Sequence, residues 1–345
     1  MKILSIETSC DETAVAVVED GNKVLSSVVY SQIKDHKIFG GVVPEIASRK
    51  HIETISNICN EAVKQASIPL KSIDAIAVTY SPGLIGALLV GVNFAKGLAY
   101  YLKKPLVPVN HIASHIASNY ISNPELKPPF LCLVVSGGHT QIIDVLDYTL
   151  FKIVSTTRDD AVGEVFDKVA RVLGLGYPGG VEIEKYALNG NSLAYKFPHP
   201  KINGYDFSFS GLKTSVINLV NKINQSSEVL NIEDIAASFQ KTAVDILVDK
   251  FMLAARENNY KNLALAGGVS ANKLLRKTLI ERTAESYNLN IPKLAWCGDN
   301  AAMVGAQGYF EYLNGNVAPL NLNADARSFM GTIWKYLFAK YIEFW

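Results

Sequence analysis

The hydrophobic pattern at the start of the chain predicts three strands. The segment "KILSIETSCDETAVAVVEDGNKVLSSVVYS" alternates apolar, β-branched runs with two short polar breaks. It predicts a strand, a small polar loop, a second strand, a Gly-Asn turn and a third strand. From residue 130 the same plan recurs as "FLCLVVSGGHTQIIDVLDYTLFKIVSTT", with an SGGH loop and an Asp-Tyr turn in the corresponding places. The two segments are therefore expected to be counterparts.

The regions that follow these strands also correspond. "IDAIAVTYSPGLIGALLVGVNFAKGLAYYL" predicts a strand, a Pro-Gly break and a helix, and "NLALAGGVSANKLLRKTLIERT" predicts a strand, a Gly-Gly break and a helix. Each is followed by another expected strand and helix start, in "PLVPVNHIASHIA" and "PKLAWCGDNAAMVGA". A duplicated plan of this kind accounts for most of the chain.

The duplication predicts an α/β protein with two lobes that face each other across a cleft. We expect an N-terminal lobe over residues 1–127, which includes a helix with two histidines, and a C-terminal lobe over residues 128–299. Residues 300–327 are expected to return to the first lobe as a helix. Residues 328–345 have apolar positions at helical spacing and predict an amphipathic segment that docks on the chain itself or on a second protein.

Two glycines interrupt the strand at Ser136-Gly137-Gly138-His139. Glycine inside a strand costs roughly 0.5–1 kcal/mol relative to alanine, so a tight turn or the close approach of a ligand must compensate. In the duplicated frame, the loop at Ser9–Glu12 and the Gly267-Gly268 turn occupy related positions. Glycine-rich turns present free N–H groups that attract phosphate oxygens, so we favour a nucleotide-binding role over plain turns.

Composition and charge restrict the class of protein further. The chain has 345 residues, of which 49% are hydrophobic, and a formal net charge of +1. These values predict a globular protein of two domains without a long basic tract for nucleic acid. Its four cysteines have no CxxC spacing, which is typical of a reduced, cytoplasmic protein. We expect no secretion signal and no membrane association.

His111 and His115 are four residues apart in "VNHIASHIASNY". On a helix, side chains four positions apart lie on one face, so both imidazoles can reach a common ion. Such a pair also serves as a capping or stacking feature, and the sequence leaves that alternative open. Asp299 stands at the matching helix start of the second half, which favours a shared metal ion with open positions for substrate.

Many longer motifs resemble the bacterial TsaD family of the ASKHA (actin-like ATPase) superfamily. The resemblance runs from Lys2 to about Arg327. It is carried by the runs "IETSCDETAVAVV", "GGVVPEIASRKHIE", "PGLIGALLVGVNFAKGLA", "NHIASHIASNY", "VVSGGHTQI", "GEVFDKVARVLGLGYPGGVEIEK", "FSFSGLKT", "ASFQKTAVDIL", "LAGGVSANKLLR" and "CGDNAAMVGAQGY". The departures include Gly298, where relatives commonly carry threonine, and Val181, where proline is usual.

The resemblance implies two actin-like (ribonuclease H-like) lobes and the activity of a tRNA N6-adenosine threonylcarbamoyltransferase. Such an enzyme transfers the threonylcarbamoyl group from threonylcarbamoyl-AMP to N6 of adenosine 37 in tRNAs that read ANN codons. The family's expected partners, besides donor and tRNA, are a paralogous ASKHA subunit (TsaB-like) and a small P-loop ATPase (TsaE-like). The expected cofactor is one Fe²⁺ or Zn²⁺ ion per subunit.

Several residue roles follow from the same resemblance. It implies that His111, His115 and Asp299 bind the ion. It further implies a cradle for the phosphate and carbamoyl side of the donor, a ribose site and a nucleoside site, made respectively by Val134, Val135, Ser136, Gly137 and Gly138, by Asp167, Gly180 and Glu184, and by Asn272 with the Gly267-Gly268 turn. His139 is a candidate for assisting proton removal, or packs behind the loop. Cys10 is interpreted as a small buried side chain.

Three other classes of protein compete with this interpretation. A nucleotide-gated ASKHA module without transferase chemistry remains the main alternative, and it would have no use for the histidine pair. A sugar kinase needs an aspartate base beside a sugar pocket, and the sequence offers no convincing one. A zincin metalloprotease requires Glu directly after the first histidine, whereas Ile112 follows His111.

Overall fold

The computed structural model describes residues 1–226 and 229–327, so the amphipathic segment predicted for residues 328–345 lies outside the described residues. The first five strands form one mixed sheet in the order β3-β2-β1-β4-β5. Strands β1, β2 and β3 pair antiparallel, and β1, β4 and β5 pair parallel. The bounds of these strands are β1 (Lys2–Glu7), β2 (Glu12–Glu19), β3 (Lys23–Ser31), β4 (Ala75–Ser81) and β5 (Leu106–Asn110).

The second sheet repeats this plan with the order β10-β9-β6-β7-β8. Reading it from β8 gives the same sequence of antiparallel and parallel pairs, so β6 is the counterpart of β1 and β10 is the counterpart of β5. The two-lobed α/β fold expected from the duplicated pattern is therefore confirmed. The strands are β6 (Phe130–Val135), β7 (Thr140–Asp147), β8 (Leu150–Thr156), β9 (Asn262–Ala266) and β10 (Asn288–Asn290).

One predicted strand is wrong. The segment "PKLAW" forms a short 3-10 turn, η3 (Leu294–Trp296), and the fifth strand of the second sheet lies earlier, at β10. Pro292 has no N–H to donate to a strand ladder. Its carbonyl accepts a hydrogen bond of 2.6 Å from the Arg276 guanidinium, and the N–H of Trp296 bonds to the carbonyl of Lys293 at 2.9 Å, so these backbone groups have partners outside the sheet.

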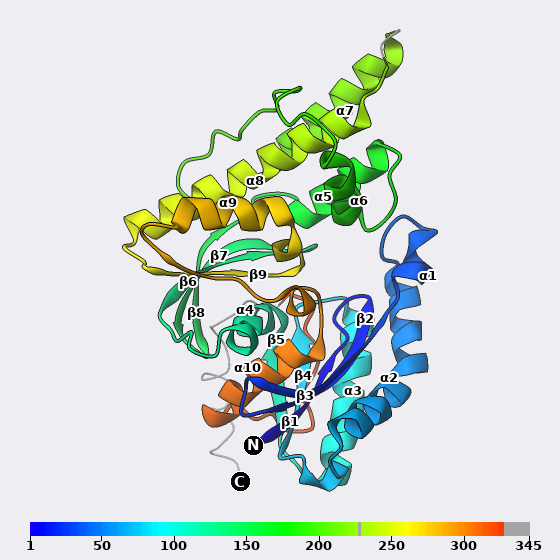
Figure 1. The fold of residues 1–345 in the computed structure, drawn as a ribbon. Helices are drawn as coiled ribbons and strands as arrows, with labels where there is room; N and C mark the ends of the chain where they lie inside the picture. Colours follow the sequence, from blue (N-terminus) through cyan, green and yellow to red (C-terminus); the bar gives the residue numbers. More distant parts are fainter. Residues whose placement is uncertain (227–228, 328–345) are drawn as a thin grey trace.

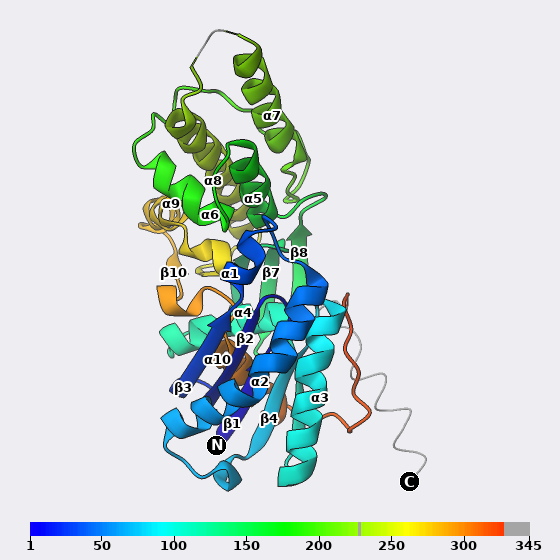
Figure 2. The same cartoon turned by 90° about the vertical axis from the view of Figure 1, so that its right-hand side faces the viewer.

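Helices cover the outer face of each sheet (Figures 1 and 2). In the first lobe, α2 (Pro44–Ala66) and α3 (Ile85–Leu102) pack on one face through a core that includes Leu4, Ile6 and Leu88, and the short α1 (Ile33–Lys37) and η1 (Leu70–Ser72) connect elements. In the second lobe a larger helical layer forms the core with the sheet. Its members are α5 (Val162–Val172), α6 (Gly179–Ala187), α7 (Ser210–Gln225), α8 (Ile232–Glu257), η2 (Gly268–Ala271) and α9 (Lys273–Thr283).

Helix α3 is, within the described residues, the one helix long and apolar enough to cross a membrane by length and composition. Its buried residues Leu88, Val92 and Ala95 belong to the core of the first lobe. Core helices of α/β proteins commonly have this composition, because they pack on a buried sheet.

Two further helices lie between the sheets, and each packs on the sheet of the other lobe (Figure 1). Helix α4 (His111–Ser122) follows β5 of the first sheet, yet its residues Ile112 and Ile116 pack against Cys132 and Val134 of the second sheet. Helix α10 (Ala301–Leu313) follows the second lobe and packs against the first sheet. We call α4 and α10 the exchanged helices.

Candidate metal centre

The candidate metal centre lies at the N-terminal ends of the exchanged helices. Helix α4 begins at His111 because Asn110 caps it, accepting hydrogen bonds from the N–H groups of Ile112 at 2.9 Å and Ala113 at 3.3 Å. Asp299 directly precedes Asn300, which caps α10 by accepting from the N–H of Met303 at 3.0 Å. The two caps fix where α4 and α10 begin, and with that the positions of the three candidate ligands.

The structure brings His111, His115 and Asp299 together. Their ligand atoms all lie within 4.8 Å of one another. Asp299 Oδ1 is 3.2 Å from His115 Nε2 and 3.7 Å from His111 Nε2. The two imidazoles meet edge to face, with ring centroids 4.6 Å apart. Atoms bound to one ion at about 2.1 Å lie about 3 to 4 Å apart. The two distances from Asp299 fall in this range, so the cluster is close to the size of a metal site.

His115 provides the clearest sign that the cluster fits an ion. Its side chain is fully buried, its Nε2 faces the Asp299 carboxylate at 3.2 Å, and its Nδ1 has no hydrogen-bond partner within the described part of the chain. Buried polar atoms are almost always paired, and an unpaired one indicates an ion or a functional role. Two imidazoles and one carboxylate are a donor set for zinc or iron(II), so the residues present fit such a cofactor.

The charges of the centre are strongly coupled. Burial opposes a charge on His111, but Asp299 and Glu7 outweigh it and raise the pKa of His111 to about 9. Burial would raise the pKa of Asp299, but the imidazoles of His111 and His115 hold this pKa well below its usual range. The region therefore pairs negative and positive groups that are buried, apart from a partly exposed Asp299, and such strongly shifted pKa values are typical of functional sites.

Glu7 was not predicted to belong to this centre. It ends β1, its side chain is fully buried, and its Oε2 lies 3.2 Å from His111 Nδ1. Burial would raise the pKa of Glu7, but the charge of His111 and its hydrogen bond lower it. The sequence does contain a signal, because an acid at the end of an otherwise apolar buried strand needs a partner.

The SGGH turn joins β6 to β7 as predicted. Val134 and Val135 are fully buried strand residues, so only the turn itself is open to a ligand. Ser136 closes the turn by donating its N–H to the carbonyl of His139 at 2.8 Å and accepting the N–H of His139 on its hydroxyl at 3.1 Å. Gly137 and Gly138 are exposed, with no described atom within 4 Å of an added Cβ at either position.

His139 lies at the end of this turn, near the histidine pair. Burial and the positive charges of His111 and His115 lower the pKa of His139 to about 4. The imidazole of His139 is therefore neutral at neutral pH.

Burial and the carboxylates of Asp11 and Asp299 raise the pKa of the Cys10 thiol well above its ordinary value, which disfavours a thiolate there.

The expected ribose and nucleoside residues gather in the helical layer of the second lobe. Helix α5 begins against the SGGH turn, because a Cβ on Gly163 would lie 2.5 Å from the carbonyl oxygen of Ser136. Asp167 on α5 accepts the N–H of Gly179 at 2.7 Å, next to Gly180 at the start of α6. Burial raises the pKa of Asp167, although the Gly179 bond opposes this.

Glu184 and Asn272 lie at the opposite end of this group. Glu184 on α6 accepts the N–H of Lys273 at 2.6 Å. Asn272 caps α9 and donates its side-chain amide to Gln240 at 3.0 Å. The four expected residues are thus linked in a line from α5 through α6 to α9, with the carboxylates of Asp167 and Glu184 already accepting backbone N–H groups.

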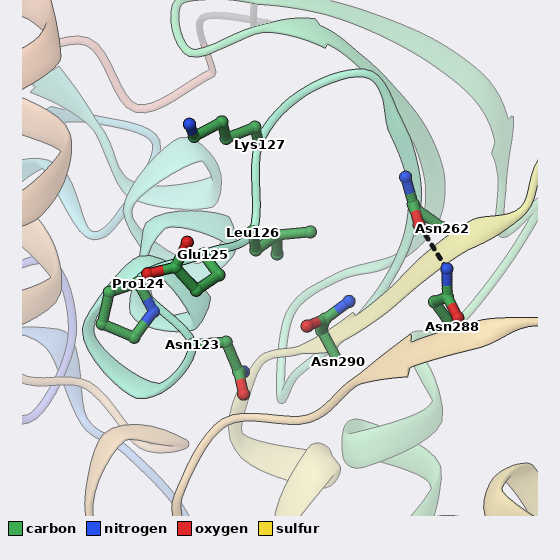
Figure 3. Close-up of a pocket in the computed structure, with 8 residues that line it drawn as sticks. All are labelled: Asn123, Pro124, Glu125, Leu126, Lys127, Asn262, Asn288 and Asn290. Atoms are coloured by element: carbon green, nitrogen blue, oxygen red, sulfur yellow. Dashed lines mark hydrogen bonds between the residues drawn. The ribbon is translucent and has the colours of Figure 1, made fainter.

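A hollow of about 360 Å³ lies elsewhere, at the end of α4 and the edge of the second sheet. Figure 3 shows side chains of Asn123, Lys127, Asn262, Asn288 and Asn290 around it, with Asn288 bound to Asn262. None of the residues predicted for the metal, donor or nucleoside sites lines this hollow.

Comparison with known proteins was consistent with one family. A family model described as TsaD, tRNA N6-adenosine threonylcarbamoyltransferase, matches residues 23–306. The chain is 55% identical over 328 residues to the tRNA N6-adenosine threonylcarbamoyltransferase of Clostridium novyi (strain NT), covering 94% of this chain and 96% of that protein. It is also 53% identical over 325 residues to the protein of the same name from Caldicellulosiruptor saccharolyticus, and this match covers 94% of this chain and 97% of that protein.

Solved structures share the fold at low sequence identity. The HypF protein of T. kodakarensis is 17% identical with a TM-score of 0.61, and the match covers 91% of this chain and 48% of that one. A likeness at this identity indicates the two-lobed architecture alone.

Proposed function

Because the chain belongs to the TsaD family of tRNA N6-adenosine threonylcarbamoyltransferases, we propose that it makes N6-threonylcarbamoyladenosine at position 37 of tRNAs that read ANN codons. The donor in this proposal is threonylcarbamoyl-AMP, and AMP is the leaving group. The observation that carries the proposal is the cluster of His111, His115 and Asp299, whose charges act on His139 at the end of the exposed SGGH turn.

We assign one Fe²⁺ or Zn²⁺ ion to His111, His115 and Asp299. Support comes from the donor set, from the distances between the ligand atoms and from the full burial of His115 among them. When bound, such an ion polarises phosphate or carbamoyl oxygens as a Lewis acid. The chain supplies three ligands, which leaves open coordination positions of the kind found in catalytic sites.

The SGGH turn is proposed to bind the phosphate and carbamoyl side of the donor. Gly137 and Gly138 have no side chains and face open space in the described structure, so a ligand can approach their backbone N–H groups. N–H groups held in a fixed turn stabilise negative charge that develops on the leaving phosphate. Val134 and Val135 act only by anchoring the turn in the sheet.

The adenosine part of the donor is assigned to the line of residues in the second lobe. Asp167 and Glu184 are carboxylates suited to ribose hydroxyls, and the open position at Gly180 lets the sugar approach the α6 backbone. Asn272, beside the Gly267-Gly268 turn, contacts the base. Each carboxylate keeps acceptor capacity beyond the backbone N–H group that it already binds.

The reaction needs no covalent intermediate with the protein. N6 of adenosine attacks the carbamoyl carbon, the bond from that carbon to the phosphate oxygen breaks, and AMP leaves while the amine loses one proton. In this proposal the proton passes to the phosphate of the leaving AMP, and His139, neutral at neutral pH, assists its removal by accepting a hydrogen bond from the amine. The raised pKa of Cys10 makes its thiol a poor nucleophile, consistent with a direct transfer.

The proposed setting is the cytoplasm, where tRNA and the donor synthase are found together. Threonylcarbamoyl-AMP is a reactive mixed anhydride, so a separate ATP-consuming synthase must supply it. We further propose a paralogous ASKHA subunit (TsaB-like) and a small P-loop ATPase (TsaE-like) as partners, and no contact with a membrane.

A reconstituted reaction tests the proposed activity. The protein is incubated with threonine, bicarbonate, ATP, unmodified tRNA, the companion synthase and the two proposed partners, and the nucleosides are analysed by mass spectrometry. We expect threonylcarbamoyladenosine to form only when this chain is present, and to decline after treatment with a chelator. ATP binding without any modified nucleoside would favour the nucleotide-gated module instead.

A substitution in the SGGH turn tests the proposed donor site. Gly137→Val introduces a side chain whose Cβ meets no described atom within 4 Å, so the fold should persist while donor binding is lost. Gly211→Val, at another exposed open glycine on α7, is the matched control. Equal affinities of both variants for threonylcarbamoyl-AMP would mean that the SGGH segment is only a turn.

A further inference from the structure

Glu7 is surrounded by hydrogen-bond donors at the end of β1. Its Oε1 accepts the N–H of Ser9 at 2.5 Å, and its Oε2 accepts the hydroxyl of Thr79 at 2.5 Å. The same Oε2 lies 3.2 Å from His111 Nδ1. The side chain is fully buried, and a buried carboxylate persists only when such partners satisfy it. The Glu7 carboxylate is therefore held by Thr79 of β4 and by Ser9 of the loop that follows β1, and Oε2 still faces His111.

This arrangement selects one form of the His111 ring. An ionised carboxylate only accepts hydrogen bonds, so a bond to Glu7 requires the proton on Nδ1. The hydroxyl of Ser9, 3.1 Å from the same nitrogen, can accept from that proton as well. In the neutral form of the ring that binds a metal, the lone pair then resides on Nε2, the nitrogen that faces Asp299 at 3.7 Å. Thus the ring is both oriented and given the tautomer that a metal ion requires at Nε2.

We propose that Glu7 is a positioning residue for the metal centre, which fixes the orientation and the Nδ1–H tautomer of His111. The inference rests on the metal site of the proposed function, and it assigns a role to a side chain that touches neither substrate nor ion. His115 has no comparable partner at its Nδ1 within the described residues. Orientation of the ligand pair therefore depends on Glu7 and the caps of the helices.

Zinc affinity provides the first test. The full-length protein and its Glu7→Gln variant are titrated with zinc against a chromophoric chelator at one fixed pH. The substituted side chain retains the shape of glutamate but replaces one acceptor oxygen with a donor, so the affinity for zinc should fall by about 10- to 100-fold. Glu311→Gln is the matched control, because Glu311 on α10 also accepts side-chain hydrogen bonds, from Gln307 and Asn316, away from the centre.

The outcomes separate this inference from the proposed function. Zinc binding by the unsubstituted protein with an unchanged affinity in Glu7→Gln overturns the role of Glu7 and leaves the metal site standing. Failure of the unsubstituted protein to bind zinc overturns the metal site and, with it, this inference. Weaker binding in Glu7→Gln but not in Glu311→Gln supports it.

A measurement on the unsubstituted protein decides the question if Glu7→Gln does not fold. In the zinc-loaded, ¹⁵N-labelled protein, the His111 ring should show a proton on Nδ1 and a metal-shifted Nε2 resonance. A metal-shifted Nδ1, or a proton on Nε2, would overturn the proposal, because Glu7 then faces the wrong nitrogen. A merely structural role of Glu7 predicts no such preference.

Discussion

The exchanged helices α4 and α10 occupy equivalent places in the two halves but carry different residues. Each begins after an asparagine cap, Asn110 or Asn300. The first and fifth helical positions of α4 are His111 and His115, and the same positions of α10 are Ala301 and Gly305. The residue before the cap is Val109 in the first half and Asp299 in the second. One helix therefore contributes two imidazoles, and the other only the carboxylate before its cap.

The difference follows from what each helix touches. Helix α10 approaches the first sheet so closely that a Cβ on Gly305 would lie 2.6 Å from Val18 Cγ2 and 2.8 Å from Ser5 Oγ. Ser5 also donates its hydroxyl to the carbonyl of Ala301 at 2.6 Å. In α4 the residues next to the histidines make the contacts with the second sheet, which frees the histidines for the centre. The duplicated fold gives both helices the same place, and the two histidines lie at positions of α4 that are not part of its apolar packing on the second sheet.

Of the changes that test this difference between α4 and α10, removing one imidazole should have the largest effect on activity. His115→Ala gives α4 a small residue like that of α10, and we expect metal content and threonylcarbamoyl transfer to fall together, by more than about 100-fold in rate. Elemental analysis and nucleoside mass spectrometry measure both. His199→Ala, which removes an exposed histidine, serves as the control. A variant with normal activity and no metal would exclude the Lewis-acid role.

The second prediction concerns the pH dependence of stability in the chelator-treated protein. The pKa of His111 is about 9 in the folded chain and about 6.5 in an unfolded one, so the folded chain binds the proton more tightly. This contribution is complete below about pH 6.5 and is lost as pH rises through about 9, on the order of 3 kcal/mol. Urea unfolding across this range measures it.

The equivalent position of α10 is Ala301, which has no titratable group. The change of unfolding free energy with pH should therefore come from His111 on α4. His111→Gln should therefore flatten the dependence between about pH 6.5 and 9. An unchanged slope in His111→Gln would show that another group titrates there.

The third prediction concerns a larger side chain on α10, at the position equivalent to His115 of α4. Gly305→Ala should lower the free energy of unfolding by about 1–3 kcal/mol, because the new Cβ overlaps Val18 and Ser5. Gly97→Ala on α3, where an added Cβ meets no described atom within 4 Å, should instead raise it by about 0.5–1 kcal/mol. Denaturant unfolding compares the two. Equal effects would mean that the close approach of α10 to the first sheet is not required.

The smallest effects are expected at the two caps. Asn110→Ala and Asn300→Ala each remove a side-chain acceptor from a helix start and should cost about 1 kcal/mol of unfolding free energy. Asn300→Ser, which keeps an acceptor, should cost only a few tenths of a kcal/mol. Calorimetry on the three variants checks this order. A much larger loss at only one cap would contradict the equivalence of the two helix starts.

The strands and the histidine pair were predictable from sequence because both depend on local spacing, whereas Asp299 was predicted from its place in the duplicated plan. Alternating apolar residues gave the three-stranded segments of both lobes, and the four-residue interval placed His111 and His115 on one helical face. The strand predicted in "PKLAW" failed because the partners of its backbone groups, such as the Arg276 guanidinium, cannot be read from apolar composition. A proline alone does not exclude a strand, since Pro108 lies inside β5.

What the sequence could not supply is long-range packing. The apolar face of α4 is visible in its pattern, but nothing in that pattern states that it covers the second sheet. Glu7 was overlooked for the same reason, since its partners Thr79 and His111 lie 72 and 104 positions away. The hydrogen bonds of Asp167 and Glu184 to backbone N–H groups likewise depend on how α5, α6 and α9 assemble.

The exchange of α4 and α10 has a consequence for biosynthesis. Ile3, Ala77 and Val107 on the inner face of the first sheet are covered by α10, which leaves the ribosome roughly 190 residues after β5. At 5–20 residues per second, that apolar face stays bare for roughly 10 to 40 s. The N-terminal half therefore cannot complete its core during translation. Nascent chains should engage chaperones until almost the whole polypeptide has emerged.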